Sequence, residues 1–247
     1  MKILVCICKT PDTTAKVSFI NDNSIFDENG VQFIINPYDE WYALVRAIEL
    51  KEADSAHSIN LITVGSADLD PIIRKCFALG GDEAFRINCS PKTSLETAFQ
   101  LAAFIKENNY DLILCGKESI DFNNGLVGPL LAEYLNMPFF GNASNLILQN
   151  NLVQITCEVE GGQEIYESAT PLIVGCQKGM AEQRIPNMRN IMSSRTKPLK
   201  VVEPKNFENN LMVNDYQLTP PKTGVKTFNE DELDSLVDML HHELKLF

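Results

Sequence analysis

Short apolar runs alternate with segments of helical length along most of the chain, and this alternation restricts the possible folds most strongly. The runs are rich in Ile, Leu, Val and Cys, which is typical of strands covered on both faces of a parallel sheet. Strands and helices that alternate at this spacing require right-handed crossovers. The sequence therefore predicts an α/β fold with a doubly wound, mainly parallel sheet, whose strands are Ile3 to Cys8, Ser58 to Val64, Ala84 to Ile87, Asp111 to Cys115 and Leu172 to Cys176.

Amphipathic segments between these runs predict four helices. In the segment from Asn36 to Glu52, apolar residues recur at i, i+3, i+4 and i+7, and Asn36 followed by Pro37 is typical of an N-cap and a first helical residue. The helix that starts at Ser94 is expected to bury a face with Leu95, Phe99, Ala102, Ala103 and either Ile105 or the aliphatic part of Lys106. The other three helices are predicted from about Asp68 to Leu79, from Ser94 as N-cap to about Asn108, and from about Gly128.

The last third of the chain changes character. Two alternating stretches, Leu152 to Val159 and Gln163 to Glu167, flank a glycine-containing turn and predict an antiparallel hairpin. Periodicity is lost after Pro198 and returns only in a helical pattern over 229–246. Long structureless stretches are unusual inside a compact domain. We therefore expect an α/β domain over 1–203 and a C-terminal arm over 204–247 that lies on a partner chain.

Composition excludes several classes of function. The chain has 21 Lys and Arg residues against 33 Asp and Glu residues, and its net charge of -12 disfavours nucleic acid and anionic membranes as partners. Apolar runs stay well below the about 18 residues that span a bilayer, and the first residues do not resemble a signal peptide. Seven cysteines, mostly inside apolar runs, indicate free thiols in a reducing compartment. We expect no membrane insertion and a cytoplasmic location, or an organelle matrix after import.

Motifs that carry catalysis or bind metals are missing from the sequence. It has no Gly-x-Gly-x-x-Gly, no Walker A loop and no Cys-x-x-Cys, and its three histidines lie away from the predicted strand ends. We predict no catalytic residue and no metal site. The remaining candidates are the loops after three predicted parallel strands, because doubly wound sheets bind ligands there: Cys6 to Asp12, Gly65 to Ala67, and Gly116 to Gly128.

The loop from Gly116 to Gly128 is the most informative of these. Glycines allow the backbone to approach a ligand, and free N–H groups at the start of the following helix favour a phosphate. An ordinary glycine-rich connection between a strand and a helix explains the composition equally well. Asn36 likewise has two interpretations, as an N-cap and as a ligand-binding residue.

At these residues the chain resembles the beta subunit of electron transfer flavoproteins. The similarity covers about residues 1–204 in unbroken order. It is carried by ILVCICKTPDT, INPYDEWYALVRAIELKE, GKESID before a glycine-rich helix start, VEGGQEIYESATPLIVGCQKG, and RIPNMRNIMSSRTKPLKVVEP. Agreement between several separate motifs makes a chance match improbable.

The resemblance implies a Rossmann-like fold of the adenine nucleotide alpha hydrolase type. It also implies a heterodimer with a larger alpha subunit, in which this chain helps to enclose one FAD held mainly by alpha. Such a pair carries electrons from acyl-CoA dehydrogenases or other flavoprotein dehydrogenases to an acceptor such as a quinone reductase, or takes them from NADH in electron-bifurcating members. The flavin performs the redox chemistry, which agrees with the absence of catalytic motifs.

The family's beta subunit also binds its own nucleotide, which is AMP in simple members and a second FAD in bifurcating ones. Val127-Gly128-Pro129 stands where AMP-type members have Thr-Gly-Gln, and Asp121 to Asn124 replaces the usual stretch of the FAD form, so the choice between AMP and FAD stays open. The matching positions are Cys6, Asn36, Pro37, Tyr38, Asp39, Val64, Asp121, Phe122, Asn123, Asn124, Gly125, Leu126, Val127, Gly128, Pro129, Leu130, Leu131 and Ala132. Backbone amides there would hold phosphate, and Asn36 or Asp39 would recognise ribose or base.

A second set of positions matches the segment with which the family recognises its dehydrogenases. Met188 takes the place of a leucine that anchors into the partner, and methionine is a flexible apolar side chain that fits many pockets. The alternative to the whole interpretation is a stand-alone nucleotide-binding or hydrolase module of related fold, although the chain lacks a Ser-Gly-Gly-x-Asp-Ser loop. The matching positions, called the recognition segment below, are Arg184, Ile185, Pro186, Asn187, Met188, Arg189, Asn190, Ile191 and Met192.

Overall fold

A computed structural model describes residues 1–149, 152–208, 211, 213–222 and 224–247 of the chain. The chain forms two compact units. The first consists of Met1–Lys16 and Glu28–Asn214, and the second of Val17–Asp27 and Asp215–Phe247. The candidate site lies in the first unit.

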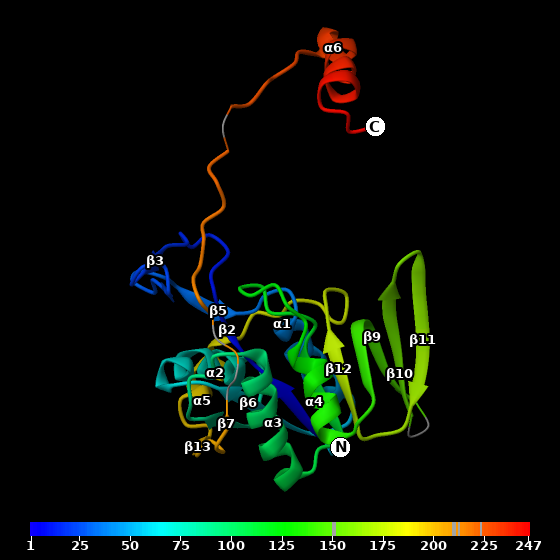
Figure 1. The fold of residues 1–247 in the computed structure, drawn as a ribbon. Helices are drawn as coiled ribbons and strands as arrows, with labels where there is room; N and C mark the ends of the chain where they lie inside the picture. Colours follow the sequence, from blue (N-terminus) through cyan, green and yellow to red (C-terminus); the bar gives the residue numbers. More distant parts are fainter. Residues whose placement is uncertain (150–151, 209–210, 212, 223) are drawn as a thin grey trace. The chain divides into compact units, whose positions relative to one another are not determined.

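A nine-stranded sheet, counted over the described residues, forms the centre of the first unit (Figure 1). Its pairs are parallel except for β9 with β10 and β10 with β11, and Ile3 of β1 stands opposite Ile59 of β6 and Leu112 of β8. The predicted doubly wound, mainly parallel sheet is therefore confirmed. In spatial order the strands are β11 (Gly162–Ser168), β10 (Leu152–Val159), β9 (Phe139–Gln149), β12 (Leu172–Cys176), β8 (Leu112–Gly116), β1 (Lys2–Cys6), β6 (Ser58–Val64), β7 (Glu83–Ile87) and β13 (Leu199–Val202).

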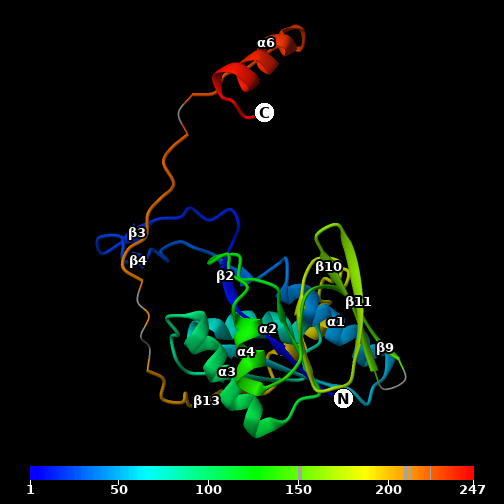
Figure 2. The ribbon, with the colours of Figure 1, turned by 45° about the vertical axis from the view of Figure 1, so that its right-hand side comes forward.

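Helices cover both faces of this sheet (Figures 1 and 2). Successive side chains of a strand point to opposite faces, so β1 contributes to two separate cores. Ile3 and Val5 belong to the core shared with α1 and α2, whereas Leu4 and Cys6 belong to the core shared with α3 and α4. These helices are α1 (Glu40–Ala53), α2 (Asp70–Leu79), α3 (Ser94–Asn108) and α4 (Val127–Leu135).

Two predicted helix starts are wrong in detail. Helix α1 begins at Glu40, with Asp39 in the N-cap position, whereas Asn36 uses its side-chain oxygen to accept a hydrogen bond from the Tyr38 N–H at 3.1 Å. Asn36 therefore closes a local turn before the helix, a common alternative role for Asn. At α3 the cap is Thr93, one residue before the expected Ser94, and its hydroxyl accepts from the Glu96 N–H at 3.2 Å.

The buried face of α3 agrees only in part with the expected one. Ala102 and Ile105 are buried as expected. Leu95, Phe99 and Ala103 are only half-buried, whereas Ala98 and Leu101, which were not expected, are buried. The reason is that α3 packs on the sheet and on α4 at the same time, so its buried stripe is broader than one periodic face and is displaced along it. The helical periodicity of apolar residues indicates one buried face, so it does not reveal that α3 also packs on α4.

The hairpin is confirmed, whereas two further strands of the central sheet, β9 and β13, were not predicted. Strands β10 and β11 pair antiparallel around a turn at Glu160 and Gly161, with Val159 opposite Gly162. Strand β9 pairs with both β10 and β12, and β13 extends the far edge of the sheet beside β7. The first unit also contains a short ribbon of β2 (Lys9–Pro11) with β5 (Phe33–Ile35), a 3-10 turn (Ala67–Leu69) and helix α5 (Met188–Ser194).

The second unit is small. Strands β3 (Phe19–Ile20) and β4 (Ile25–Phe26) form a hairpin, and the Tyr216 ring stacks on Phe19 with 4.9 Å between ring centroids. The expected helix over 229–246 is divided into a 3-10 turn, α6 (Leu233–Asp238) and a π-helical turn (Met239–Glu243). Within the part of the chain that the structure describes, no helix is long and apolar enough to cross a bilayer.

Candidate functional site

The strand order places a topological switch point between β1 and β8. From β1 the chain continues outward through β6 and β7, and then crosses back to β8 on the other side of β1. Open parallel sheets bind ligands outside the carboxyl ends of the strands at such a point. The loops that follow β1 and β8, both singled out from the sequence, meet there through contacts with residues 36–40.

The side chains of Asn36 and Asp39 bind the two backbone polar groups of Glu118, its carbonyl and its N–H. The Asn36 side chain donates to the Glu118 carbonyl at 2.9 Å, and an Asp39 carboxyl oxygen accepts from the Glu118 N–H at 3.1 Å. Both side chains are buried, and burial raises the pKa of the Asp39 carboxyl. The two residues thus fix the start of the loop after β8, and their recognition of ribose or base stays a prediction.

Glu40 lies beneath this contact, between the loops after β1 and β8. Its carboxyl group accepts a hydrogen bond from the Cys8 thiol at 2.9 Å, and its second oxygen, Oε2, is buried without a partner. A Cβ atom on Gly116 would lie 2.7 Å from the Glu40 carboxyl carbon, so only glycine allows this packing. Burial raises the pKa of Glu40 to about 8, which keeps the carboxyl mainly protonated and uncharged at neutral pH.

The loop over 116–126 is closed by its own hydrogen bonds. The Ser119 N–H donates to the Asn124 carbonyl at 3.0 Å, and the Phe122 N–H donates to an Asp121 carboxyl oxygen at 3.0 Å. Asn124 also accepts from the Ser94 hydroxyl at 3.2 Å, which ties the loop to the start of α3. Phe122 and Leu126 are both more than half exposed at the surface of the loop.

Helix α4 begins directly after this loop without a side-chain cap. Leu126 occupies the N-cap position and has no hydrogen-bonding side chain, and Pro129 has no N–H. The amides of Val127 and Gly128 are therefore the donors at this helix start, where the helix dipole also favours an anion. Uncapped N–H groups at the carboxyl edge of a sheet suit a phosphate group.

Gly128 allows α4 to approach the sheet closely. A Cβ atom at Gly128 would lie 2.7 Å from the Phe139 ring, and one at Gly141 or Gly175 would lie 3.2 Å from it. The Phe139 ring thus fills a space lined by three glycines from α4, β9 and β12. The position of the helix start depends on that space.

The other predicted nucleotide positions differ in accessibility. Tyr38 is about half exposed, and Val64 lies at the end of β6, where the next residue is held by Arg86. Cys6 is buried at the end of β1. Leu131 and Ala132 lie in the core between α4 and the sheet, so their side chains do not reach this surface.

Two buried side chains with titratable groups, Glu40 and Arg86, lie at this edge and were not found by sequence reasoning. Glu40 reads as an ordinary acidic residue of a first helical turn. Arg86 donates to the Gly65 carbonyl at 3.1 Å and to the Asp70 carboxylate at 2.8 Å, and so fixes the loop after β6. The available signal for Arg86 was a single cation inside an otherwise apolar strand.

The thiols near the site remain protonated, and two of them, Cys6 and Cys115, are buried, whereas Cys8 is partly buried. Burial raises the pKa of Cys115 to about 12, and it raises the pKa values of Cys6 and Cys8 as well. A thiol of this kind is a poor nucleophile and a poor metal ligand. Among the described residues, no group of three or more His, Cys, Asp and Glu side chains is arranged to hold a metal ion.

The recognition segment presents apolar side chains to solvent. Ile185 is 95% exposed, Met188 73% and Met192 70%. Asn187 caps helix α5 by accepting from the Asn190 N–H at 2.8 Å, and α5 packs against α2. Exposed apolar side chains gathered on one short segment are typical of a protein contact.

The comparisons with known proteins agree with the resemblance seen in the sequence. The family model described as electron transfer flavoprotein domain matches residues 23–206. The chain is 30% identical over 260 residues to the electron transfer flavoprotein subunit beta of Bacillus subtilis, with 100% of both chains covered. It is 32% identical over 235 residues to the subunit beta of Syntrophomonas wolfei, with 94% of this chain and 92% of that one covered. It is also 29% identical over 256 residues to the mitochondrial subunit beta of Oryza sativa subsp. indica, with 100% of both covered. The family model spans most of the chain and the relatives match nearly all of it, and the chain therefore belongs to the family of electron transfer flavoprotein beta subunits.

Proposed function

We propose that this chain pairs with an electron transfer flavoprotein alpha subunit and helps to enclose an FAD that alpha mainly holds. The pair takes electrons from flavoprotein dehydrogenases of the acyl-CoA dehydrogenase type and passes them to an acceptor such as a quinone reductase. The observation that carries this proposal is the match to beta subunits over nearly the whole chain. The flavin supplies the redox chemistry, and the protein supplies binding, geometry and electrostatics.

The chain would also hold an adenine nucleotide of its own, AMP or a second FAD, at the carboxyl edge of the sheet. The amides at the start of α4 would hold phosphate, and the loop after β8, fixed through Glu118 by Asn36 and Asp39, would form the wall beside it. An ionised carboxylate near this wall would repel phosphate, and the protonated state of Glu40 removes one such charge. The residues present therefore fit a phosphate-bearing ligand.

The test of this proposal compares the chain alone with the chain produced together with an alpha subunit. We expect the pair to copurify with bound FAD, whose visible absorbance bleaches when an acyl-CoA dehydrogenase and its substrate are added. The chain alone should carry no flavin that is reducible in this way. A stable chain that ignores alpha would contradict the proposal, and turnover of ATP by the lone chain would favour the hydrolase alternative.

A further inference from the structure

The recognition segment is anchored on two different helices. It is short, it exposes Ile185, Met188 and Met192, and its helix α5 packs on α2. A surface segment of this size would sample many conformations unless its ends were fixed. Two sets of charged contacts, one before the exposed residues and one after them, fix those ends.

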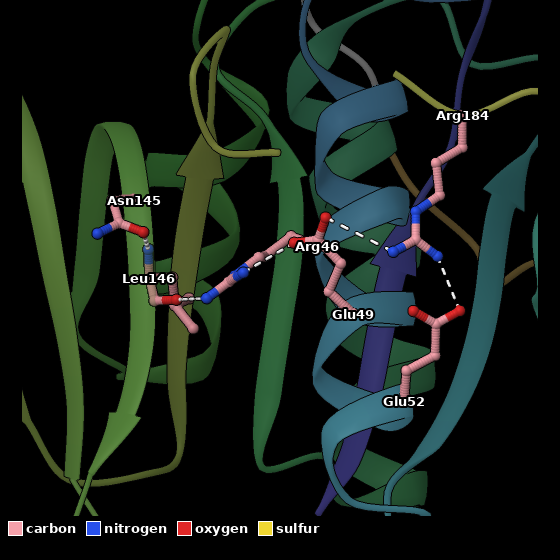
Figure 3. A network of polar contacts seen from close by, with 6 residues as sticks. All are labelled: Arg46, Glu49, Glu52, Asn145, Leu146 and Arg184. Atoms are coloured by element: carbon pink, nitrogen blue, oxygen red, sulfur yellow. Dashed lines mark hydrogen bonds and ion pairs between the residues drawn. The ribbon is translucent and has the colours of Figure 1, made fainter. Parts of the chain in front are cut away.

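The first anchor joins Arg184 to helix α1 (Figure 3). The Arg184 guanidinium donates to Glu52 at 2.8 Å and forms an ion pair with Glu49 at 3.7 Å. Arg46 donates to the other oxygen of Glu49 at 2.7 Å, and it also donates to the carbonyl of Leu146 in β9. The Glu49 carboxylate is thus shared by two guanidinium groups, of which Arg46 is itself fixed on the sheet.

The second anchor holds the far end of the segment on α2. Arg74 donates through one nitrogen to the carbonyls of Ser194, the last residue of α5, and Lys197, at 2.9 and 2.7 Å. Lys197 in turn donates to the Gly81 carbonyl at 2.6 Å and the Phe77 carbonyl at 3.2 Å. A cation at the last carbonyls of a helix satisfies groups that have no partner within the helix.

We infer that Glu49 and Arg74 are positioning residues that hold the recognition segment at its two ends, so that its apolar side chains meet the dehydrogenase in a fixed geometry. The inference rests on the proposed function for the identity of the partner. Neither residue belongs to the recognition segment; Glu49 acts through Arg184, and Arg74 acts through the backbone of residues 194 and 197. A segment ordered before binding loses less conformational entropy on docking, which strengthens the complex without any new contact.

The test measures electron transfer from an acyl-CoA dehydrogenase as a function of heterodimer concentration. The variants are Glu49→Gln made together with Glu52→Gln, so that Arg184 keeps neither acceptor, then Arg74→Met, and the combination of all three changes. We expect the KM to rise about tenfold when either anchor is removed, equivalent to about 1.4 kcal/mol, because KM includes the cost of ordering the segment. The kcat should stay within about twofold, because the docked geometry and the flavin are unchanged. Arg74→Lys should restore part of the affinity, since a Lys ammonium can reach one of the two carbonyls.

Hydrogen exchange is a second readout. It reports the order of the segment directly, so it distinguishes a positioning role from a general loss of stability and does not depend on the identity of the partner. In the heterodimer, hydrogen exchange of the α5 amides, including Ile191, whose N–H donates to Asn187 at 3.0 Å, should accelerate about tenfold in the variants. Exchange in α1 and the flavin content should not change. The control is Lys75→Gln, which removes an exposed positive charge from the same helix α2 and leaves Arg74 and its two carbonyl contacts in place.

Two results would overturn the inference. One is an unchanged KM and unchanged α5 exchange in a heterodimer that does transfer electrons. The other is a parallel loss of kcat, flavin content and thermal stability, which marks general unfolding. If the wild-type heterodimer transfers no electrons, the proposed function fails, but the exchange measurement still decides whether the two anchors order the segment.

Discussion

Replacing Glu40 with glutamine should remove a large pH dependence from the stability of the protein. An unfolded Glu40 loses its proton near its ordinary pKa of 4.5, whereas burial raises the pKa of the folded carboxyl to about 8. Between these values the folded state holds one more proton than the unfolded state. The contribution of Glu40 to stability is therefore complete below the ordinary pKa and is lost as the pH rises toward 8.

The size of the effect follows from the proton linkage. Each pH unit in this interval should lower the free energy of unfolding by about 1.4 kcal/mol through Glu40, or by about 3 kcal/mol between pH 5 and pH 7. Urea unfolding of the wild-type protein and of Glu40→Gln at both pH values measures the difference directly. Glutamine keeps an oxygen that can accept the hydrogen bond from Cys8 but cannot ionise. The stability of Glu40→Gln should therefore increase relative to that of the wild-type protein as the pH rises.

The matched control is Glu52→Gln. Hydrogen bonding to Arg184 lowers the pKa of Glu52, so its removal should not produce the same dependence on pH. An equal slope of unfolding free energy against pH in the wild-type protein and in Glu40→Gln would show that Glu40 is ionised in the folded state. That result would contradict the conclusion that the buried Glu40 carboxyl beneath the site is uncharged at neutral pH.

The second large effect is expected for Gly128→Val. The new Cβ would lie 2.7 Å from the Phe139 ring and 3.3 Å from the Cys115 sulfur, so α4 or the ring must move. Overpacking of this kind costs about 1–3 kcal/mol of folding stability. It also displaces the amides at the start of α4, and we expect the heterodimer to lose most of its second adenine nucleotide while it keeps the FAD held by alpha.

A control and a rescue separate steric displacement from general damage. Gly162→Ala adds a Cβ where nothing lies within 4 Å, and it should leave stability and nucleotide content unchanged. Combining Gly128→Val with Phe139→Leu makes room for the added methyl groups and should restore part of both. Full nucleotide content in Gly128→Val, together with wild-type stability, would exclude close approach of α4 as a requirement of the site.

Sequence patterns predicted the parts of the fold that depend on local periodicity. The central parallel strands are continuous apolar runs, and the hairpin has a glycine turn, so their positions are correct to within a few residues. Strand β9 was not predicted because Gly141, Asn142 and Asn145 interrupt its apolar pattern. Strand β13 was not predicted because it is only four residues long and pairs with a single neighbour, β7, at the edge of the sheet.

The sequence indicated which loops form the candidate site but not which side chains contact each other within it. Loops after β1 and β8 follow from the rule that ligands bind at the carboxyl edge, and Asn36 was singled out with them. Its contact with Glu118 spans 82 positions of sequence and the Cys8 contact with Glu40 spans 32, distances over which periodicity carries no information. The recognition segment was singled out through resemblance. Its contacts with α1 (Figure 3) and with α2 join residues far apart in the sequence, so they are visible only in three dimensions.

The most direct measurement is the identification of nucleotides released when the purified heterodimer is denatured. Chromatography of the supernatant should show FAD together with a second adenine nucleotide, either AMP or more FAD, and the second component should be depleted in Gly128→Val. This result would place a nucleotide at the carboxyl edge of the sheet beside α4. Release of a single FAD and no further nucleotide from the wild-type heterodimer would contradict a nucleotide site in this chain.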